Sequence, residues 1–290
     1  MDGWKLGITG ANARHLMRML KQGRRPAAAV YDSLGSEFFL SPAPGWLNLG
    51  LWDGAGDEQE AEAAVHRLVR TLASDLPTGG SILDVGNGLG AQDSVIDEVT
   101  SPRLLVAINL TESQLRAGRE RLDAARACPV LADAVQIPVR SHEIDGVISV
   151  EAAFHFSSRQ RFFGEVRRVL RRGGRLAMSD ISVERPRPRS LSEAVAGLSN
   201  LRTWGVKRSS LQSSAEIREM LSNLGFTNIV IRPVGDRVFP PAIAFMRRRL
   251  ERSPDAPAIQ RLGARLLLDQ WDLLYQHGMV DYILVTATTA

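Results

Sequence analysis

Apolar residues along the chain alternate between two spacings, one typical of amphipathic helices and one typical of buried strands. The β-branched and apolar runs predict strands at residues 81–85, 104–109, 129–131, 146–150, 175–181, 226–233 and 279–287. The helical spacing predicts helices at residues 57–75, 91–99, 111–127, 159–171, 190–204 and 215–224, with residues 237–276 mostly helical. Strands that alternate with helices predict an α/β fold: a doubly wound, mostly parallel seven-stranded sheet covered on both faces.

Residues typical of helix ends refine three of these boundaries. Thr111 with Gln114 three positions later predicts a capping box, and Ser214 is the expected N-cap of helix 215–224. The pair Gly173-Gly174 is expected to end helix 159–171.

The spacing also changes after residue 182, where a Pro/Arg-rich linker begins. We expect residues 1–56 to form an N-terminal helical or lid segment, and residues 57–182 to form the core that binds the principal ligand. Residues 183–212 and 235–276 then form a helical cap for substrate binding or dimerisation. Residues 213–234 and 277–290 supply the last strands of the core sheet.

Composition indicates an ordinary globular protein, with 44% hydrophobic and 23% charged residues among 290. The net charge of +4 comes from arginines scattered over predicted helical faces, which favours a solvated surface over a stripe that binds nucleic acid. Cys128 is the only cysteine, which excludes an intrachain disulfide and fits a cytoplasmic protein. No apolar stretch is long enough for a transmembrane helix, and no His/Cys cluster has metal-ligand spacing.

A glycine-rich turn, residues 84–90, lies between the first predicted strand and its helix. Gly86, Gly88 and Gly90 leave the backbone bare, so that a ligand can approach it beside a helix N-terminus. A turn at this place in an alternating series favours a nucleotide-type ligand.

Residues 82–90 resemble the first motif of the class I S-adenosylmethionine-dependent methyltransferases, an apolar strand that ends in acidic-x-Gly-x-Gly-x-Gly. The resemblance implies a Rossmann-like methyltransferase fold and S-adenosylmethionine as cofactor. It implies that Gly86, Asn87, Gly88 and Gly90 wrap its methionine part, and that Asp84 helps to hold the loop and the cofactor's amino group.

Later blocks resemble the same family in order, over about residues 80–181. Asn109, with Leu110 after it, stands where the family usually has an acidic residue for the ribose hydroxyls, and Gln114 matches a later Gln of some small-molecule subfamilies. The alternative is that Asn109 and Gln114 are only turn and capping residues. Asp133 and Ala134 match the block that holds adenine.

The ends of the chain resemble natural-product, sterol and related lipid or sugar methyltransferases more weakly. Tyr31-Asp32 followed by Asn48–Trp52 resembles the N-terminal segment that closes over the cofactor in that group, where the tyrosine matched by Tyr31 lies near the cofactor's carboxylate. Glu151, at the end of the fourth predicted strand, is also expected beside the cofactor.

The residues that bind the methyl acceptor and assist the reaction are expected after the fourth predicted strand. His155 is a candidate general base, since histidine titrates near neutral pH. The family often has two adjacent His here, and this chain has Phe154 at the first position. Glu151 is a candidate catalytic carboxylate if the acceptor is a carbon, and Asp180 is expected to orient His155, contact substrate or cap the next segment. Four aromatic side chains are candidates for an apolar acceptor pocket or for the core: Phe154, Phe156, Trp204 and Phe239.

These features predict an enzyme that methylates a small, largely apolar specialised metabolite, with an oxygen acceptor as first choice. A C-methyltransferase acting on a prenyl or polyketide carbon is the second choice, and an N-acceptor stays open. A nucleic-acid methyltransferase is disfavoured because no Asn/Asp-Pro-Pro-Tyr/Phe block follows the fourth strand. A non-catalytic scaffold that keeps the fold is the remaining alternative. We expect no membrane partner and leave a homodimer or higher homo-oligomer open.

Overall fold

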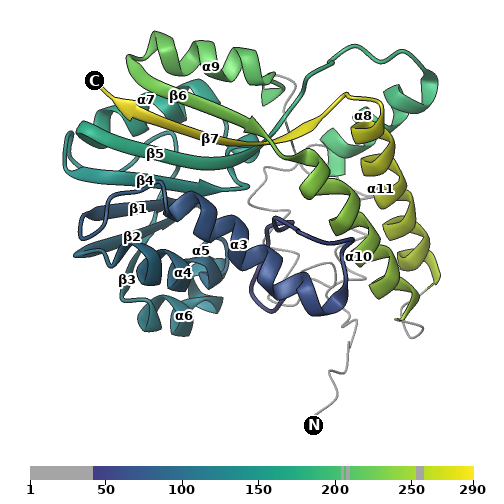
Figure 1. Ribbon diagram of the computed structural model, residues 1–290, viewed down its shortest axis with the longest axis horizontal. Helices are drawn as coiled ribbons and strands as arrows, with labels where there is room; N and C mark the ends of the chain where they lie inside the picture. Colours follow the sequence, from purple (N-terminus) through teal and green to yellow (C-terminus); the bar gives the residue numbers. More distant parts are fainter. Residues whose placement is uncertain (1–41, 204–205, 207–209, 253–257) are drawn as a thin grey trace.

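The computed structural model describes residues 42–203, 206, 210–252 and 258–290. A seven-stranded sheet with the order β3-β2-β1-β4-β5-β7-β6 forms its centre (Figure 1). Its strands are β1 (Ser81–Val85), β2 (Leu104–Asn109), β3 (Ala127–Leu131), β4 (Ile144–Val150), β5 (Leu170–Ser182), β6 (Phe226–Pro233) and β7 (Asp281–Thr289). The pairs among β1 to β5 are parallel, whereas β7 runs antiparallel to both β5 and β6. The predicted mostly parallel sheet is therefore confirmed.

Alternating side chains of the central strands fill two apolar layers, one on each face of the sheet. Ile82 points into the layer under helices α3 (Ala61–Ala73), α4 (Ala91–Thr100) and α6 (Arg119–Ala124). Leu83 points into the opposite layer, under α7 (Arg159–Val169) and α9 (Ser214–Asn223). Strands buried on both faces read as continuous apolar runs, which is why the sequence located them well.

Three further helices lie together at one end of the sheet (Figure 1): α8 (Leu191–Thr203), α10 (Phe239–Glu251) and α11 (Ala258–Gln276). We call them the late helices. Helix α11 packs against both α8 and α10. Segment 42–56, which we call the N-terminal loop, contacts α10 and the turn before it: the ring of Trp52 lies 5.6 Å from that of Phe245 in α10, and the Trp52 backbone N–H donates to the Arg237 carbonyl (2.9 Å).

Several predicted boundaries were wrong, each for a local reason. The expected helix 111–127 is two short helices, α5 (Glu112–Ala117) and α6, which meet at Gly118. The predicted capping box is absent: the Thr111 side chain makes no cap, and Gln114 Oε1 accepts from Asn109 Nδ2 (3.0 Å).

Two other helix ends were also misplaced. Helix α7 ends at Val169, ahead of the glycine pair, and the chain continues directly into β5. The N-cap of α9 is Ser213, which forms a reciprocal capping box with Glu216.

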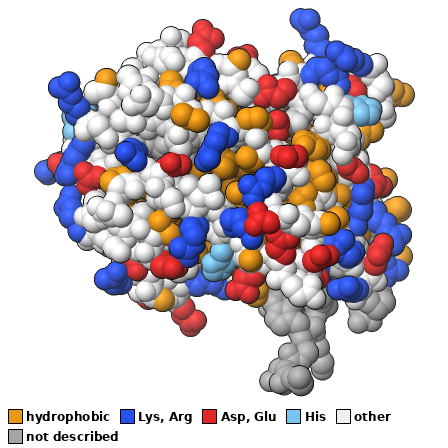
Figure 2. Space-filling view, viewed as in Figure 1, with side chains coloured by type: hydrophobic (Ala, Val, Ile, Leu, Met, Phe, Trp, Pro, Cys, Tyr) orange, Lys and Arg blue, Asp and Glu red, His pale blue; other side chains and the backbone are white. Residues whose placement is uncertain are grey.

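The surface carries interspersed charges. Figure 2 shows arginine and lysine side chains mixed with aspartate and glutamate over the visible face. Several pairs lie within single helices, such as Arg116 with Glu112 (2.7 Å) and Arg119 with Asp123 (2.8 Å). Among the described residues, no helix combines the length and apolar character needed to cross a membrane.

Candidate functional site

The glycine turn follows β1 directly, at the point where the sheet order switches from β2 on one side to β4 on the other. Ligands of open α/β sheets bind at this kind of crevice. The backbone N–H groups of Gly86 (2.8 Å) and Asn87 (3.3 Å) donate to the Ile108 carbonyl of β2, which holds the turn against the neighbouring strand. Gly86, Gly88 and Gly90 all have positive φ angles, of 84°, 58° and 77°.

The turn is bare because its surroundings leave no room for side chains. A Cβ on Gly86 would lie 2.5 Å from the Cβ of Ala152, which is closer than two carbon atoms can approach. Leu47, from the N-terminal loop, lies directly over Gly88, 3.1 Å from the position of a Cβ there. Only glycine fits this conformation and this packing without strain.

Two buried carboxylates lie beneath the turn. Both oxygens of Asp84 accept from Gln92 Nε2 (2.9 and 2.7 Å), yet burial raises the pKa of Asp84 to about 7. Burial, together with the nearby charge of Asp84, also raises the pKa of Asp93 well above its usual value. Asn87 Oδ1 and Asp93 Oδ1 are both buried, and neither has a hydrogen-bond partner in the described part of the chain. This cluster offers hydrogen-bond acceptors to a cationic or N–H group beside the turn.

Asn109 ends β2 and links three segments. Its Nδ2 donates to the Gly88 carbonyl (3.0 Å) and to Gln114 Oε1 (3.0 Å), and its Oδ1 accepts from the Thr111 backbone N–H (2.9 Å). An aspartate at this position would have no N–H group to donate to Gly88. The carboxamide therefore fits as a structural link, and its predicted contact with the ribose remains a prediction.

The predicted adenine block follows β3 at the same sheet edge. The Asp133 carboxylate accepts from the Val135 backbone N–H (3.0 Å), and Ala134 is buried beside it. The Ala132 N–H donates to the Asn109 carbonyl (3.0 Å), which joins this block to the end of β2. Leu110, predicted to contact the cofactor, is 55% exposed.

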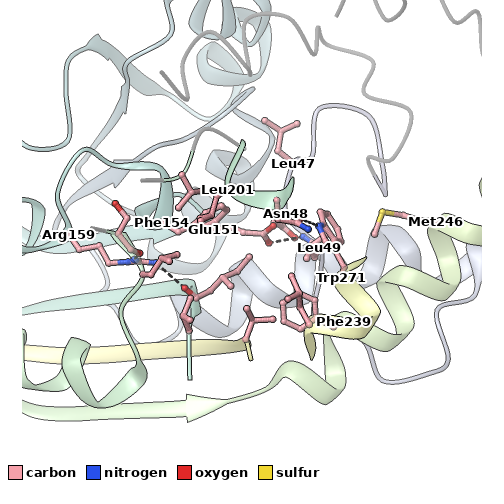
Figure 3. A pocket seen from close by; sticks show the side chains of 18 of the residues that line it. Leu47, Asn48, Leu49, Glu151, Phe154, Arg159, Leu201, Phe239, Met246 and Trp271 are labelled. Carbon is pink, nitrogen blue, oxygen red and sulfur yellow. Dashed lines mark hydrogen bonds between the residues drawn. The ribbon is translucent and has the colours of Figure 1, made fainter. Parts of the chain in front are cut away.

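A mostly apolar cavity of about 160 Å³ lies where the N-terminal loop, the ends of β4 and β5, and the late helices meet (Figure 3). Its walls include three groups of residues: Pro42, Leu47, Asn48 and Leu49; Glu151, Phe154, Arg159, Ile181, Val183, Val206, Ser210 and Leu211; and Asn200, Leu201, Phe239, Met246, Trp271, Leu274 and Val280. Such a cavity suits an apolar ligand with a few oriented polar contacts.

Glu151 is the carboxylate in this cavity wall, one residue beyond β4. Its Oε2 accepts from the Leu49 backbone N–H (2.9 Å) and from the Tyr282 hydroxyl (2.9 Å). Burial raises the pKa of Glu151 to about 7, although both hydrogen bonds favour the ionised form. Its φ of 51° is unusual for a residue with a side chain, and such backbone strain concentrates at functional sites.

His155 and Asp180 are not brought together by the contacts around them. His155 belongs to a short 3₁₀ turn, Ala153–His155, and its ring lies 3.9 Å from the ring of Phe154, but it is not among the cavity-lining residues. Asp180 is fully buried and pairs with Arg159 through two hydrogen bonds (2.7 and 3.1 Å). Arg159 also donates to Gln212 and to the carbonyls of Ile181 and Ser210.

The predicted aromatic residues divide between cavity and core. Phe154 and Phe239 line the cavity, whereas Phe156 packs on Phe162 with ring centroids 4.8 Å apart and is not among the lining residues. Trp204 and Tyr31 lie outside the described residues.

Most cavity-lining residues were not predicted as site residues, among them Asn48, Asn200 and Trp271. Asn48 begins the segment Asn48–Trp52, which resembles a family segment that closes over the cofactor, but the resemblance implies no role for its side chain. Asn200 lies in the predicted helix 190–204 and Trp271 in the mostly helical segment 237–276, where periodicity alone does not mark a site residue. The hydrogen bond from Trp271 Nε1 to Asn200 Oδ1 (2.7 Å) joins α11 to α8 across the cavity wall, and no local pattern records such a pairing.

Comparison with known proteins agrees with this geometry. Residues 83–178 match a family described as a methyltransferase domain. The chain is 26% identical to the erythromycin 3''-O-methyltransferase of Saccharopolyspora erythraea over 81% of this chain and 79% of that protein.

Two solved structures share the fold. One is a protein of Galdieria sulphuraria described as a sarcosine dimethylglycine methyltransferase (TM-score 0.73, 17% identity, covering 84% of this chain and 93% of that one). The other is the geranyl diphosphate C-methyltransferase of Streptomyces coelicolor in complex with S-adenosyl-L-homocysteine (TM-score 0.66, 17% identity, 90% and 98% covered).

The glycine turn fits S-adenosylmethionine, because its backbone, free of side chains, lies at the switch point of the sheet and buried hydrogen-bond acceptors lie beneath it. The motif, the fold and the matched domain agree with one another. The chain is therefore an S-adenosylmethionine-dependent methyltransferase, with a methyltransferase domain at residues 83–178 and a Rossmann-like methyltransferase fold.

Proposed function

We propose that the enzyme transfers the methyl group to a hydroxyl of a small, largely apolar specialised metabolite held in the cavity. The observation that carries this proposal is the single carboxylate that the described residues contribute to a mostly apolar cavity wall, Glu151, whose pKa burial raises to about 7. The resemblance to the erythromycin 3''-O-methyltransferase supports an oxygen acceptor.

Bound S-adenosylmethionine supplies a methyl group that its sulfonium already activates. The protein then has to orient the acceptor, exclude water and remove one proton from the hydroxyl. Phe239, Met246 and Trp271 form the apolar wall that orients the acceptor and excludes water. Ionised Glu151 takes the hydroxyl proton, and Tyr282 and the Leu49 N–H hold its Oε2 in place.

The alternative base is His155, the candidate that the sequence analysis placed first, because it adjoins Phe154 at the cavity. The Glu151→Gln and His155→Asn variants separate the two. A general base contributes about 10²- to 10⁴-fold to the rate, so kcat should fall by that factor in the variant that lacks it.

The pH profile distinguishes them further. A base with a pKa of about 7 is increasingly protonated at lower pH, so kcat/KM of the wild type should fall about tenfold per pH unit below about 7. If the fall in kcat/KM below pH 7 (the acidic limb of the profile) is lost in Glu151→Gln, Glu151 is supported as the general base. Loss of this limb in His155→Asn alone, with the limb intact in Glu151→Gln, would transfer the role to His155.

Methyl transfer itself is measured with S-adenosylmethionine carrying a labelled methyl group and a panel of hydroxylated macrolides and polyketides. Product NMR distinguishes an O-methyl from a C-methyl group. Calorimetric titration with S-adenosylhomocysteine tests cofactor binding separately, with Gly88→Arg as a control that fills the turn. Transfer only to carbon would contradict the proposed hydroxyl acceptor.

A further inference from the structure

Asn48 lines the cavity, and only the oxygen of its carboxamide has a hydrogen-bond partner among the described residues. The side chain is 4% exposed, and its Oδ1 accepts from the Gly50 backbone N–H (3.0 Å). A backbone N–H only donates, so the oxygen must face Gly50 and the nitrogen must face the other way. Nδ2 is buried and has no hydrogen-bond partner in the described parts of the chain. Buried donors are almost always satisfied, so this group points to a ligand oxygen.

The chain places this donor beside the candidate base. Leu49, the next residue, donates its N–H to Glu151 Oε2, so the carboxamide and the carboxylate share one wall (Figure 3). The loop is anchored around them, because Trp52 Nε1 donates to the Leu49 carbonyl (2.8 Å) and the Leu51 N–H donates to the Ala64 carbonyl (2.8 Å). Both polar groups are therefore held in position before a ligand binds.

Other polar side chains of the wall are already engaged. Asn200 donates to the Ala196 carbonyl (2.9 Å) and to Gln270 (3.1 Å), and its oxygen accepts from Trp271. Arg159 is paired with Asp180. Both hydrogen bonds that Glu151 receives from described residues end on Oε2, which leaves Oε1 for a ligand.

We propose that Asn48 donates a hydrogen bond to a second oxygen of the acceptor, next to the hydroxyl that Glu151 deprotonates. The substrate class is then an alcohol with an oxygen on the neighbouring carbon, such as a vicinal diol or an α-hydroxy ketone. This inference rests on the O-methylation proposed above. The acceptor is favoured over the cofactor's carboxylate as the source of this oxygen, because Asn48 shares its cavity with the late helices and not with the glycine turn.

Two small ring alcohols test this directly. Cyclohexanol and 2-hydroxycyclohexanone differ by one oxygen, and ligand-observed NMR gives the Kd of each for the full chain saturated with S-adenosylhomocysteine. One hydrogen bond corresponds to about a fivefold difference, so the hydroxy ketone should bind about fivefold more tightly to the wild type. In Asn48→Asp, which keeps the shape and the acceptor for Gly50, and in Asn48→Ala, the ratio of the two Kd values should approach one.

The inference is overturned if the wild type does not discriminate between the two alcohols, if it binds neither, or if the variants keep the discrimination. A Kd for S-adenosylhomocysteine that rises fivefold or more in Asn48→Ala, measured by calorimetry, would assign Asn48 to the cofactor and would also overturn it. The ratio of the two Kd values is a binding measurement and does not depend on methyl transfer. A protein that discriminates between the alcohols but transfers no methyl group to oxygen contradicts only the proposed function.

Discussion

At the scale of single residues, the site contains carboxyl groups whose pKa values are raised by burial. Asp84, Asp93 and Glu151 all have raised pKa values, and desolvation is the largest cause for each. Sequence reasoning identified Asp84 from the resemblance of the glycine turn to a family motif, and Glu151 from its place at the end of the fourth predicted strand. It did not identify Asp93, because its burial depends on packing under the turn. The site therefore combines residues that a sequence motif identifies, such as Asp84, with residues such as Asp93 that no motif identifies.

The raised pKa of Asp84 predicts a pH-dependent stability. Between its usual value of 3.8 and about 7, the folded protein keeps a proton that the unfolded chain releases, so stability should fall as pH rises through this window. In Asp84→Asn the slope of unfolding free energy against pH should flatten by about 1.4 kcal/mol per pH unit. Urea unfolding between pH 4 and 7 measures this slope.

Asp123→Asn serves as the matched control, since Asp123 lies on the surface and pairs with Arg119. An unchanged slope in Asp84→Asn, or an equal change in both variants, would contradict a buried proton on Asp84.

At the scale of elements, the glycine turn depends on the break between α5 and α6. Gly118 lies at this break, and a Cβ there would be 2.5 Å from the Leu89 carbonyl oxygen of the turn. The break therefore lets the two backbones approach each other. The helical spacing of residues 111–127 gave no sign of it, because the reason lies across the interface and not within the helix.

Gly118→Ala should therefore displace the turn and weaken cofactor binding. We expect at least a tenfold rise in the Kd for S-adenosylhomocysteine by calorimetry, together with a lower unfolding free energy, because overpacking costs about 1–3 kcal/mol. Gly164→Ala in α7 is the control. Nothing lies within 4 Å of a Cβ at Gly164, so it should stabilise the protein by about 0.5–1 kcal/mol. Equal cofactor affinity in both variants would refute the role of Gly118.

At the scale of the whole molecule, Arg159 joins segments that are distant in sequence. It begins α7, pairs with Asp180 near the end of β5, and donates to the segment around Ser210. Buried charges of this kind are costly unless every group is paired. The pair therefore holds the cavity wall between the sheet and the chain that follows α8.

Arg159→Met should lower the unfolding free energy by about 3–5 kcal/mol, because it leaves the carboxylate of Asp180 buried without its partner. The double variant Arg159→Met/Asp180→Leu should recover most of that loss, since it removes both charges. Urea denaturation of the wild type, of Arg159→Met, of Asp180→Leu and of the double variant gives the coupling energy between the two residues. Additive effects would show that the pair does not act as a unit.

The sequence by itself located the strands and the glycine turn, because both depend on residues that are close together along the chain, and the cofactor followed from the resemblance of that turn to a family motif. Apolar runs, helical periodicity and the spacing of glycines are local properties, and the strands at residues 81–85, 104–109 and 226–233 were predicted with the observed bounds. The cavity that we propose for the acceptor was decided only by the tertiary structure. Glu151 takes its hydrogen bonds from Leu49, 102 positions away, and from Tyr282, 131 positions away. No local pattern records such contacts, because they arise only when the N-terminal loop, the sheet edge and the late helices pack together.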